Sequence, residues 1–206
     1  MINSKKPIRI GVVGMGRAFT LMIPTFVKDS RIILTAGADP RREAQQQFIE
    51  EFGGQAFEDC ESLLSGSEVD LIYLATPAVQ HLNQVRKIAE AGKHILLEKP
   101  IALSITEGKQ INDIIDQSGI LLIVGHSHGF DRPIQLAREK IISGQYGELK
   151  FLTTINFTDF MYRPRRPDEL MTELGGGVVF SQAAHQIDVI RILSGGIIKS
   201  IKANPY

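Results

Sequence analysis

The sequence predicts an α/β protein in which a doubly wound parallel sheet is followed by the start of a second, incomplete α/β domain. Two observations carry this prediction. Short apolar runs rich in Val, Ile and Leu alternate with longer amphipathic segments as far as Gly125, and such an order implies right-handed crossovers between parallel strands. Beyond Gly125 the pattern changes, which indicates two domains, at residues 1–125 and 126–206.

The first domain is expected to contain strands that are continuously apolar, because strands inside a parallel sheet are buried on both faces. They are expected at residues 8–13, 32–38, 71–75, 95–97 and 121–124. Helices are expected after Gly16 and at residues 41–52, 81–91 and 104–117. The last of these begins with Ser104 and Glu107, which are spaced as a capping box, and stops at Gly119.

The second domain is expected to have helices at 133–143 and 177–193 and strands at 149–157 and 198–203. A sheet of about two strands is rarely stable by itself. The sequence therefore leaves two explanations open: the chain is a fragment, or another chain completes the sheet.

Composition limits the functional classes. The 206 residues are 43% hydrophobic, which is ample for a packed core, and carry no net formal charge. Neutrality gives no basic field for nucleic acid, and one cysteine, Cys60, forms neither an internal disulfide nor a zinc cluster. Arginines and glycines interrupt the apolar stretch near the start, so no signal peptide or membrane span is expected. We therefore expect a cytoplasmic protein.

A glycine fingerprint follows the first expected strand. Gly14 and Gly16 stand between that strand and a helix, the setting in which such glycines bind a dinucleotide. The first allows a tight turn, and the second lets the backbone approach a pyrophosphate at the positive helix N-terminus, where Arg17 is a further candidate contact. Phe19 replaces the usual small third residue, so the helix is expected to pack farther from the strand. A plain strand–turn–helix is the alternative.

Asp39 closes the second expected strand, at the position where an acid accepts hydrogen bonds from the adenosine ribose. A carboxylate there repels a 2′-phosphate and so favours NAD. Arg41 and Arg42 follow at once, and an arginine there stacks on adenine or holds a 2′-phosphate, so NADP is not excluded. Asp39 also suits a helix N-cap ahead of Pro40, and the two roles are compatible.

Two more segments are expected at the same edge of the sheet. Thr76 and Pro77 end a strand ahead of His81, and such a turn can line the nicotinamide ribose. Glu98 and Lys99 follow the next strand, at the carboxyl edge where open α/β sheets bind ligands. Burial or a neighbouring cation there lowers the pKa of a lysine toward the range useful for proton transfer.

In order and spacing, these residues resemble the glucose-fructose oxidoreductase/inositol dehydrogenase/MocA (Gfo/Idh/MocA) superfamily along the whole chain. The matching motifs are Ile10–Gly16, Ala38–Asp39, Ala75–His81, Ala91–Pro100 and Gly175–Asp188. The resemblance implies a Rossmann domain, then an α/β domain whose large open sheet binds substrate on one side and commonly a partner subunit on the other. It also implies that Lys99 hydrogen-bonds the substrate oxygen near the nicotinamide and that His185 is the acid/base for the hydroxyl proton.

Two positions depart from the pattern of the superfamily. Ser181 stands where many members have Asp, four residues before His185 and so on the same helical face. Serine brings no negative charge, so substrate contacts or protonation there must differ. Gly129 stands where members often carry a basic residue.

A closer resemblance is to the phthalate cis-dihydrodiol dehydrogenase subgroup. It is carried by Gly16–Pro24, Val124–Pro133, Thr158–Pro167 and Val179–Gln186. It implies NAD(P)-dependent oxidation of a cyclic, carboxylated cis-diol such as the dihydrodiol of phthalate. Arg163, Arg165 and Arg166 suit the carboxylates, because guanidinium groups bind them bidentately, although a solvated loop is the alternative. His126 and Ser181 are further candidate substrate contacts.

Three other interpretations stay open. One is a sugar or inositol dehydrogenase of the same superfamily, and another is a protein that binds a nicotinamide dinucleotide without catalysis. The third is a metal hydrolase, since His126 and His128 would share one face if they lay on a strand. No further cluster of acids and histidines supports that site, so no metal is expected.

Overall fold

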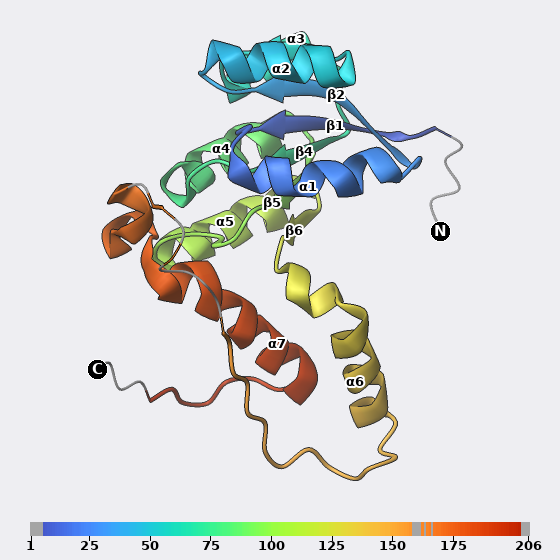
Figure 1. Ribbon diagram of the computed structural model, residues 1–206, viewed down its shortest axis with the longest axis vertical. Helices are drawn as coiled ribbons and strands as arrows, with labels where there is room; N and C mark the ends of the chain where they lie inside the picture. The colour runs from blue at the N-terminus through green and yellow to red at the C-terminus, as the bar shows by residue number, and fades with distance from the viewer. Residues whose placement is uncertain (1–5, 158–161, 163, 166, 203–206) are drawn as a thin grey trace. The chain divides into compact units, whose positions relative to one another are not determined.

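The computed structural model describes residues 6–157, 162, 164, 165 and 167–202 (Figure 1). The chain divides into two compact units, the first ending at Gly125 and the second beginning at His126. The first unit is an α/β sheet with helices, and the described part of the second is helical.

The first unit is built on six parallel strands in the order β3-β2-β1-β4-β5-β6. The strands are β1 (Ile8–Val13), β2 (Ile32–Ala38), β3 (Gln55–Phe57), β4 (Leu71–Leu74), β5 (His94–Leu97) and β6 (Leu122–Val124). This is the order of a doubly wound Rossmann sheet, which binds ligands at the carboxyl ends of its strands near the switch between β1 and β4. The predicted fold class is confirmed.

Helices connect these strands, and their ends follow local capping rules. They are α1 (Arg17–Lys28), α2 (Arg42–Phe52), α3 (Cys60–Gly66), α4 (His81–Glu90), which follows a 3-10 turn η1 (Ala78–Gln80), and α5 (Ile105–Ser118). The Ser104 hydroxyl accepts a hydrogen bond from the Glu107 N–H at 3.1 Å, as the predicted capping box requires. Gly119 ends α5 in the left-handed conformation, at φ 71°.

The sequence does not predict β3 or α3. β3 has three residues and pairs with the end of β2, so it is too short to give an alternating pattern. Gly54 precedes it, and a Cβ at that position would stand 2.7 Å from the carbonyl oxygen of Thr35. Glycine therefore lets the chain return close to β2. Asp59 then caps α3 by accepting the Ser62 N–H at 2.8 Å.

Aromatic side chains fill one of the two core clusters of the first unit. Phe19 of α1 is buried, and its ring centroid lies 6.2 Å from that of Phe48 in α2. Tyr73 of β4 packs edge-on to Phe26 at 5.3 Å. Gly37 of β2 makes room, because a Cβ there would stand 2.9 Å from the Phe48 ring. Gly37 thus makes room for Phe48, the ring against which Phe19 packs.

The described part of the second unit consists of helices and turns. They are η2 (Ser127–Phe130), α6 (Arg132–Ile142), η3 (Pro167–Leu170), η4 (Thr172–Leu174), a π-helical turn η5 (Val179–Ala183) and α7 (Ala184–Ser194). Both helices predicted for this region are found. The π-helical turn interrupts the second of them just before His185.

The prediction of strands in the second unit is wrong for residues 149–157 and 198–202. Neither segment has strand pairing, and Ala203 lies outside the described residues. A strand needs a hydrogen-bonding neighbour, and these two segments do not supply one to each other. The apolar alternation of these two segments therefore does not correspond to a sheet in the described part of this unit.

Candidate cofactor and catalytic site

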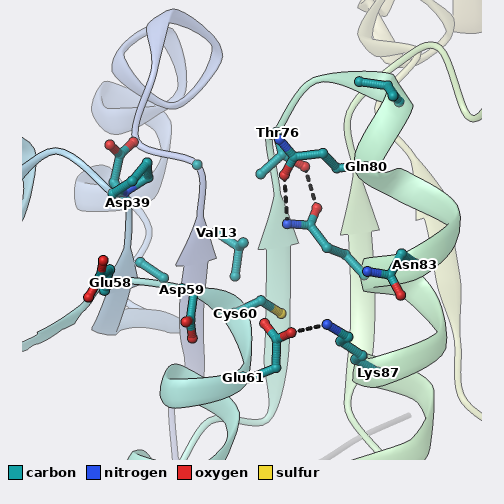
Figure 2. A pocket seen from close by; sticks show the side chains of 15 residues that line it. Val13, Asp39, Glu58, Asp59, Cys60, Glu61, Thr76, Gln80, Asn83 and Lys87 are labelled. Carbon is teal, nitrogen blue, oxygen red and sulfur yellow. Dashed lines mark hydrogen bonds and ion pairs between the residues drawn. The ribbon is translucent and has the colours of Figure 1, made fainter.

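A pocket of about 440 Å³ lies at the carboxyl ends of β1, β2 and β4 (Figure 2). Of the residues predicted to bind the cofactor, Gly14, Asp39 and Thr76 line it. The remaining candidates in the first unit are not among its lining residues: Gly16, Arg17, Arg41, Pro77, His81, Glu98 and Lys99.

The glycine turn before α1 has the geometry of an anion site. Gly14 adopts φ +92°, and a Cβ there would stand 2.8 Å from the Ala75 carbonyl group, so the turn requires glycine. A Cβ on Gly16 would meet no atom within 4 Å, which leaves open space before the helix. No side chain caps α1 and no acidic residue lies in its first turn, where Arg17 stands. The positive end of the helix dipole is therefore available to a phosphate.

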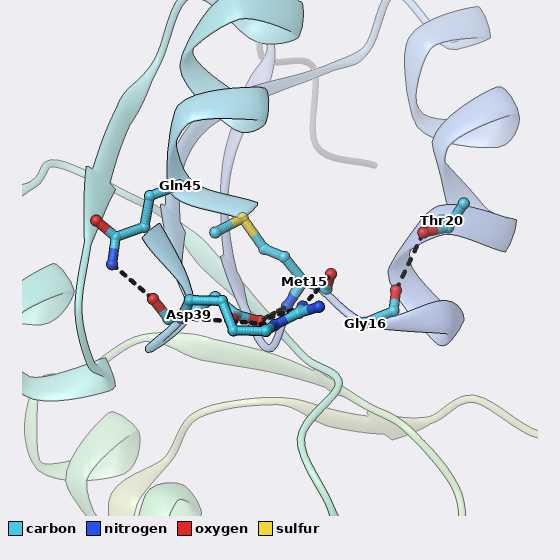
Figure 3. A network of polar contacts seen from close by, with 6 residues as sticks. Met15, Gly16, Thr20, Asp39 and Gln45 are labelled. Carbon is cyan, nitrogen blue, oxygen red and sulfur yellow. Dashed lines mark hydrogen bonds and ion pairs between the residues drawn. The ribbon is translucent and has the colours of Figure 1, made fainter. Parts of the chain in front are cut away.

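Asp39 is 6% exposed and accepts hydrogen bonds from two directions (Figure 3). The Met15 N–H donates to one carboxylate oxygen at 2.9 Å, and the Arg41 guanidinium donates to both oxygens at 2.8 and 3.0 Å. Burial alone would raise the pKa of Asp39, but the Arg41 guanidinium and the backbone N–H donors outweigh it, so the pKa lies below the ordinary value. A fixed negative charge therefore stands beside the glycine turn.

Asp39 is not a helix N-cap, as the alternative interpretation required. α2 begins at Arg42, with Arg41 at the N-cap position. The Asp39 carbonyl oxygen instead accepts a hydrogen bond from the Gln45 side chain at 2.7 Å, which ties the end of β2 to α2 (Figure 3).

The loop after β4 carries the next group of candidates. The Thr76 hydroxyl donates to the Gln84 amide oxygen at 2.5 Å, at the wall of the pocket (Figure 2). Pro77 precedes the 3-10 turn η1. His81 is 1% exposed, and its ring nitrogens lie within hydrogen-bond distance of the Thr76, Pro100 and Ile101 carbonyl oxygens. Burial lowers the pKa of His81 despite these acceptors. Its ring thus reaches two loops rather than the pocket.

Sequence reasoning missed one wall of the pocket. The additional lining residues with polar side chains include Glu58, Asp59, Glu61, Gln80, Asn83 and Lys87. Lys87 and Glu61 form an ion pair there (Figure 2). Glu58, Asp59 and Glu61 follow β3. Because the sequence does not predict that strand, it also does not predict that these acids lie at the carboxyl edge of the sheet. They make the pocket predominantly acidic.

Glu98 and Lys99 follow β5, which is the neighbour of β4 in the sheet. The Tyr73 hydroxyl donates to a Glu98 carboxylate oxygen at 2.7 Å. Burial lowers the pKa of Lys99, and the charge of Glu98 opposes that shift. The lysine therefore has the depressed pKa that the sequence analysis expects for a proton-transfer group.

The second unit brings its candidate histidines together. His185, the second residue of α7, is 9% exposed. The His128 ring stacks on the His185 ring with centroids 4.4 Å apart, and the His126 ring meets it edge-on at 6.0 Å. His126 and His128 flank the start of the 3-10 turn η2 rather than lying on a strand, so the premise of the metal hydrolase interpretation is wrong.

Gly129 explains how η2 comes this close to α7. A Cβ on Gly129 would stand 2.5 Å from the side chain of Ile192 and 2.9 Å from the Asp188 carboxylate. A basic residue, which members of the superfamily often carry here, would require the Ile192 and Asp188 side chains to move.

The remaining substrate candidates differ in what surrounds them. The Ser181 hydroxyl donates to the Gly177 carbonyl oxygen at 2.7 Å inside the π-helical region, so the same-face relation to His185 expected for a regular α-helix does not apply. Arg165 lies 3.5 Å from the Glu169 carboxylate and is 15% exposed. Arg163 and Arg166 lie outside the described residues.

Neither a metal-ligand cluster nor a membrane-spanning helix is found among the described residues. No group of three or more His, Cys, Asp and Glu side chains among them could hold a metal ion. No helix in that part of the chain has the length and apolar character needed to cross a membrane.

Comparison with protein families identifies the chain. Residues 8–126 match the model of an oxidoreductase family with an NAD-binding Rossmann fold, and residues 134–205 match the C-terminal domain of the same Gfo/Idh/MocA group. The chain belongs to the Gfo/Idh/MocA family. The glycine turn and Asp39 therefore lie in the NAD-binding domain of a Gfo/Idh/MocA protein.

Curated proteins similar to this chain include two dehydrogenases of cyclic substrates. A 1-carboxy-3-chloro-3,4-dihydroxycyclohexa-1,5-diene dehydrogenase of Comamonas testosteroni is 46% identical over 95% of this chain and 50% of its own length. An NAD-dependent scyllo-inositol 2-dehydrogenase of Bacillus subtilis is 26% identical over 96% of this chain and 57% of its own length. This chain thus spans about half the length of the curated relatives it matches.

Solved structures of dehydrogenases share the fold. A putative dehydrogenase from Bordetella bronchiseptica has a TM-score of 0.88 and 34% identity, and the match covers 92% of this chain and 50% of that one. The WlbA dehydrogenase of Bordetella pertussis, solved with NADH and UDP-GlcNAcA, has a TM-score of 0.78 and 27% identity over 92% of this chain and 56% of that one.

Proposed function

We propose that this chain is part of an NAD-dependent dehydrogenase that moves a hydride between nicotinamide and a cyclic secondary alcohol, with a carboxylated cis-dihydrodiol as the substrate class. One observation carries the proposal. At the carboxyl ends of β1 and β2, the glycine turn before the uncapped α1 lies beside the buried Asp39 carboxylate, joined to it by the Met15 N–H. This pairs an anion site with an acceptor for ribose hydroxyls.

The residues present fit NAD. The first turn of α1 offers backbone N–H groups to the pyrophosphate, and Gly16 leaves space for it. The Asp39 carboxylate would accept hydrogen bonds from the ribose hydroxyls once the Arg41 side chain moves away from it. The Arg41 side chain is 58% exposed. When bound, NAD supplies the ring that takes up a hydride.

Lys99 and His185 would handle the proton. Oxidation of an alcohol removes one hydride and one proton, so a base must take the hydroxyl proton as the hydride leaves the carbon. The imidazole of His185 suits that role near neutral pH. The Lys99 ammonium, partly buried beside Glu98, would donate a hydrogen bond to a substrate oxygen near the nicotinamide. For a cis-dihydrodiol, the enone formed then relaxes to a catechol.

The substrate class rests on the name of one relative and on the arginines near residue 165. The Comamonas testosteroni relative is named for a carboxylated dihydroxycyclohexadiene. Arginine guanidinium groups bind carboxylates bidentately, so we expect Arg165→Leu or Arg166→Leu to raise the KM for a carboxylated cis-diol about tenfold and to leave a neutral diol nearly unaffected. Steady-state kinetics with the two diols measures this. Equal loss with both diols would remove the arginines from carboxylate recognition.

The proposal is tested by NAD binding followed by turnover. Calorimetric titration of the native protein with NAD is expected to show binding, and NADH formation is expected with a carboxylated cis-diol from a panel that includes neutral diols, sugars and inositols. Turnover confined to sugars or inositols would assign another substrate class in the family. NAD binding without turnover of any panel member would favour a non-catalytic binding protein, and absence of NAD binding would contradict the proposal.

A further inference from the structure

Two buried polar side chains of the first unit contact the residues on either side of Lys99 in the chain. Tyr73 in β4 and His81 at the start of α4 are each 1% exposed. Neither lines the pocket at the carboxyl edge. Their polar atoms contact the loop that begins at Glu98, after β5.

Tyr73 reaches the residue before Lys99. Tyr73 pairs with Leu96 of β5, so Glu98, two residues farther on, lies on the same face of the sheet and within reach of an aromatic side chain. The phenol hydroxyl donates to the Glu98 carboxylate at 2.7 Å. Burial, with the Glu98 charge adding to it, raises the pKa of Tyr73, so the phenol stays protonated and remains a donor. Packing against Phe26 fixes the ring.

His81 reaches the residues after Lys99. Its Nδ1 lies 3.1 Å from the Pro100 carbonyl oxygen and 3.3 Å from that of Ile101, and its Nε2 lies 2.9 Å from the Thr76 carbonyl oxygen. A neutral imidazole carries a single N–H, so the Nδ1–H tautomer donates to the loop after β5, while the other edge of the ring packs against the loop after β4. Buried carbonyl oxygens need such partners, because water does not reach them.

We propose that Tyr73 and His81 are positioning residues for Lys99, fixing the side chain before it and the backbone after it so that the lysine is held in one partly buried orientation. Neither residue touches substrate or cofactor in this scheme. The importance of that orientation for turnover rests on the proposed function, whereas the orientation itself can be measured without turnover.

The test is competitive acetylation of lysines by acetic anhydride as a function of pH, read at Lys99 by mass spectrometry. Tyr73→Phe removes one hydroxyl and keeps the ring, and His81→Gln keeps one amide that can bond a carbonyl. In each variant we expect the rate constant for acetylation of the deprotonated Lys99 amine, taken from the pH profile, to rise about fivefold, the factor that corresponds to one net hydrogen bond. The apparent pKa of Lys99 should move toward the ordinary lysine value as water enters.

Two matched variants separate positioning from general loosening. Phe52→Leu loosens the same core cluster through the Phe19 and Phe48 rings. His94→Gln removes an imidazole that accepts the Leu121 N–H at the opposite end of β5. Both are expected to lower the melting temperature and to leave Lys99 acetylation as in the wild type. A change in the controls equal to that in Tyr73→Phe and His81→Gln would overturn the proposal.

Turnover gives a second readout. Loss of alignment at a reacting group costs up to about a hundredfold in rate, so both variants are expected to lower kcat at least about tenfold while the KM for NAD changes less than about twofold. Lys99 acetylation indistinguishable from wild type in both folded variants would overturn the proposal. If acetylation changes as expected but Lys99→Met keeps full turnover, the positioning stands and the proposed role of Lys99 fails. Should His81→Gln not fold, Tyr73→Phe decides alone.

Discussion

The Asp39 carboxylate has two kinds of donor available to it. The Met15 N–H belongs to the glycine turn and is fixed, whereas the Arg41 guanidinium sits on a side chain that is 58% exposed. Ribose hydroxyls can therefore replace the arginine, but a 2′-phosphate would meet a buried negative charge. Glu58, Asp59 and the other acids of the pocket wall add to that charge.

The first prediction concerns this choice of cofactor. Asp39→Asn removes the charge and releases Arg41, so we expect the preference for NAD over NADP to narrow by about tenfold, the scale of one charge-assisted hydrogen bond. Isothermal titration with both nucleotides measures it, and Glu50→Gln, which changes an acid later in α2 and outside the pocket lining, is the control. Preference for NADP in the unmodified protein would contradict the assignment of Asp39.

A second prediction concerns the reaction. In the native enzyme, Lys99→Met and His185→Ala are each expected to lower kcat by at least about a hundredfold, the usual scale for a lost acid/base group, while the Kd for NAD stays nearly constant. Rapid-mixing kinetics and fluorescence titration with NADH provide the two values. Near-normal turnover by His185→Ala would remove it from the reaction.

At the scale of the element, the two glycines before α1 have different roles. Gly14 is required by the fold, because its φ is positive and a Cβ would meet the Ala75 backbone at 2.8 Å. Gly16 has an ordinary negative φ of −88° and open space around it. The fold therefore tolerates a side chain at Gly16, whereas a phosphate approaching α1 does not.

The corresponding prediction is a contrast between two alanine variants. Gly14→Ala is expected to destabilise the protein by about 1–3 kcal/mol, the usual cost of a strained backbone conformation. Gly16→Ala should melt close to the wild-type temperature yet bind NAD at least about tenfold more weakly. Differential scanning calorimetry and NAD titration check both. Unchanged NAD affinity in Gly16→Ala would place the pyrophosphate elsewhere.

At the scale of the whole molecule, the two units differ in how well they bury their apolar residues. The first unit has two core clusters around its sheet. In the second, the extended segment 149–157 leaves Phe151 and Phe157 83% and 90% exposed, and Ile201 is 79% exposed. Exposed apolar surface of this kind favours association between chains.

We therefore expect the 206-residue chain to associate, whereas residues 1–125 alone fold as a monomer. Sedimentation velocity over a range of concentrations distinguishes these outcomes. Phe151→Ser with Phe157→Ser should shift the intact chain toward the monomer. A stable monomer of the unmodified 206-residue chain at all concentrations would refute the expectation.

Much of the first unit could be predicted because its signals are local. Buried parallel strands are apolar along their length, and the glycine turn and Asp39 stand at fixed points beside them, so the sequence by itself determined the Rossmann sheet and the cofactor edge. β3 was not predicted because its three residues carry no periodicity. The acids of the pocket wall follow β3, so their position was not predicted either. In the second unit, apolar alternation predicted strands, but a strand forms only with a neighbour.

Only the tertiary structure decided which way several side chains face. The contact between Tyr73 and Glu98 spans 25 residues and that between His81 and Pro100 spans 19, and neither leaves a pattern in the local sequence. The stacking of His128 on His185 likewise joins η2 to α7, next to Gly129, where a Cβ would crowd the Ile192 and Asp188 side chains. The sequence specified the strand and turn positions through backbone preference and burial, whereas these contacts follow from packing between segments that are distant in the chain.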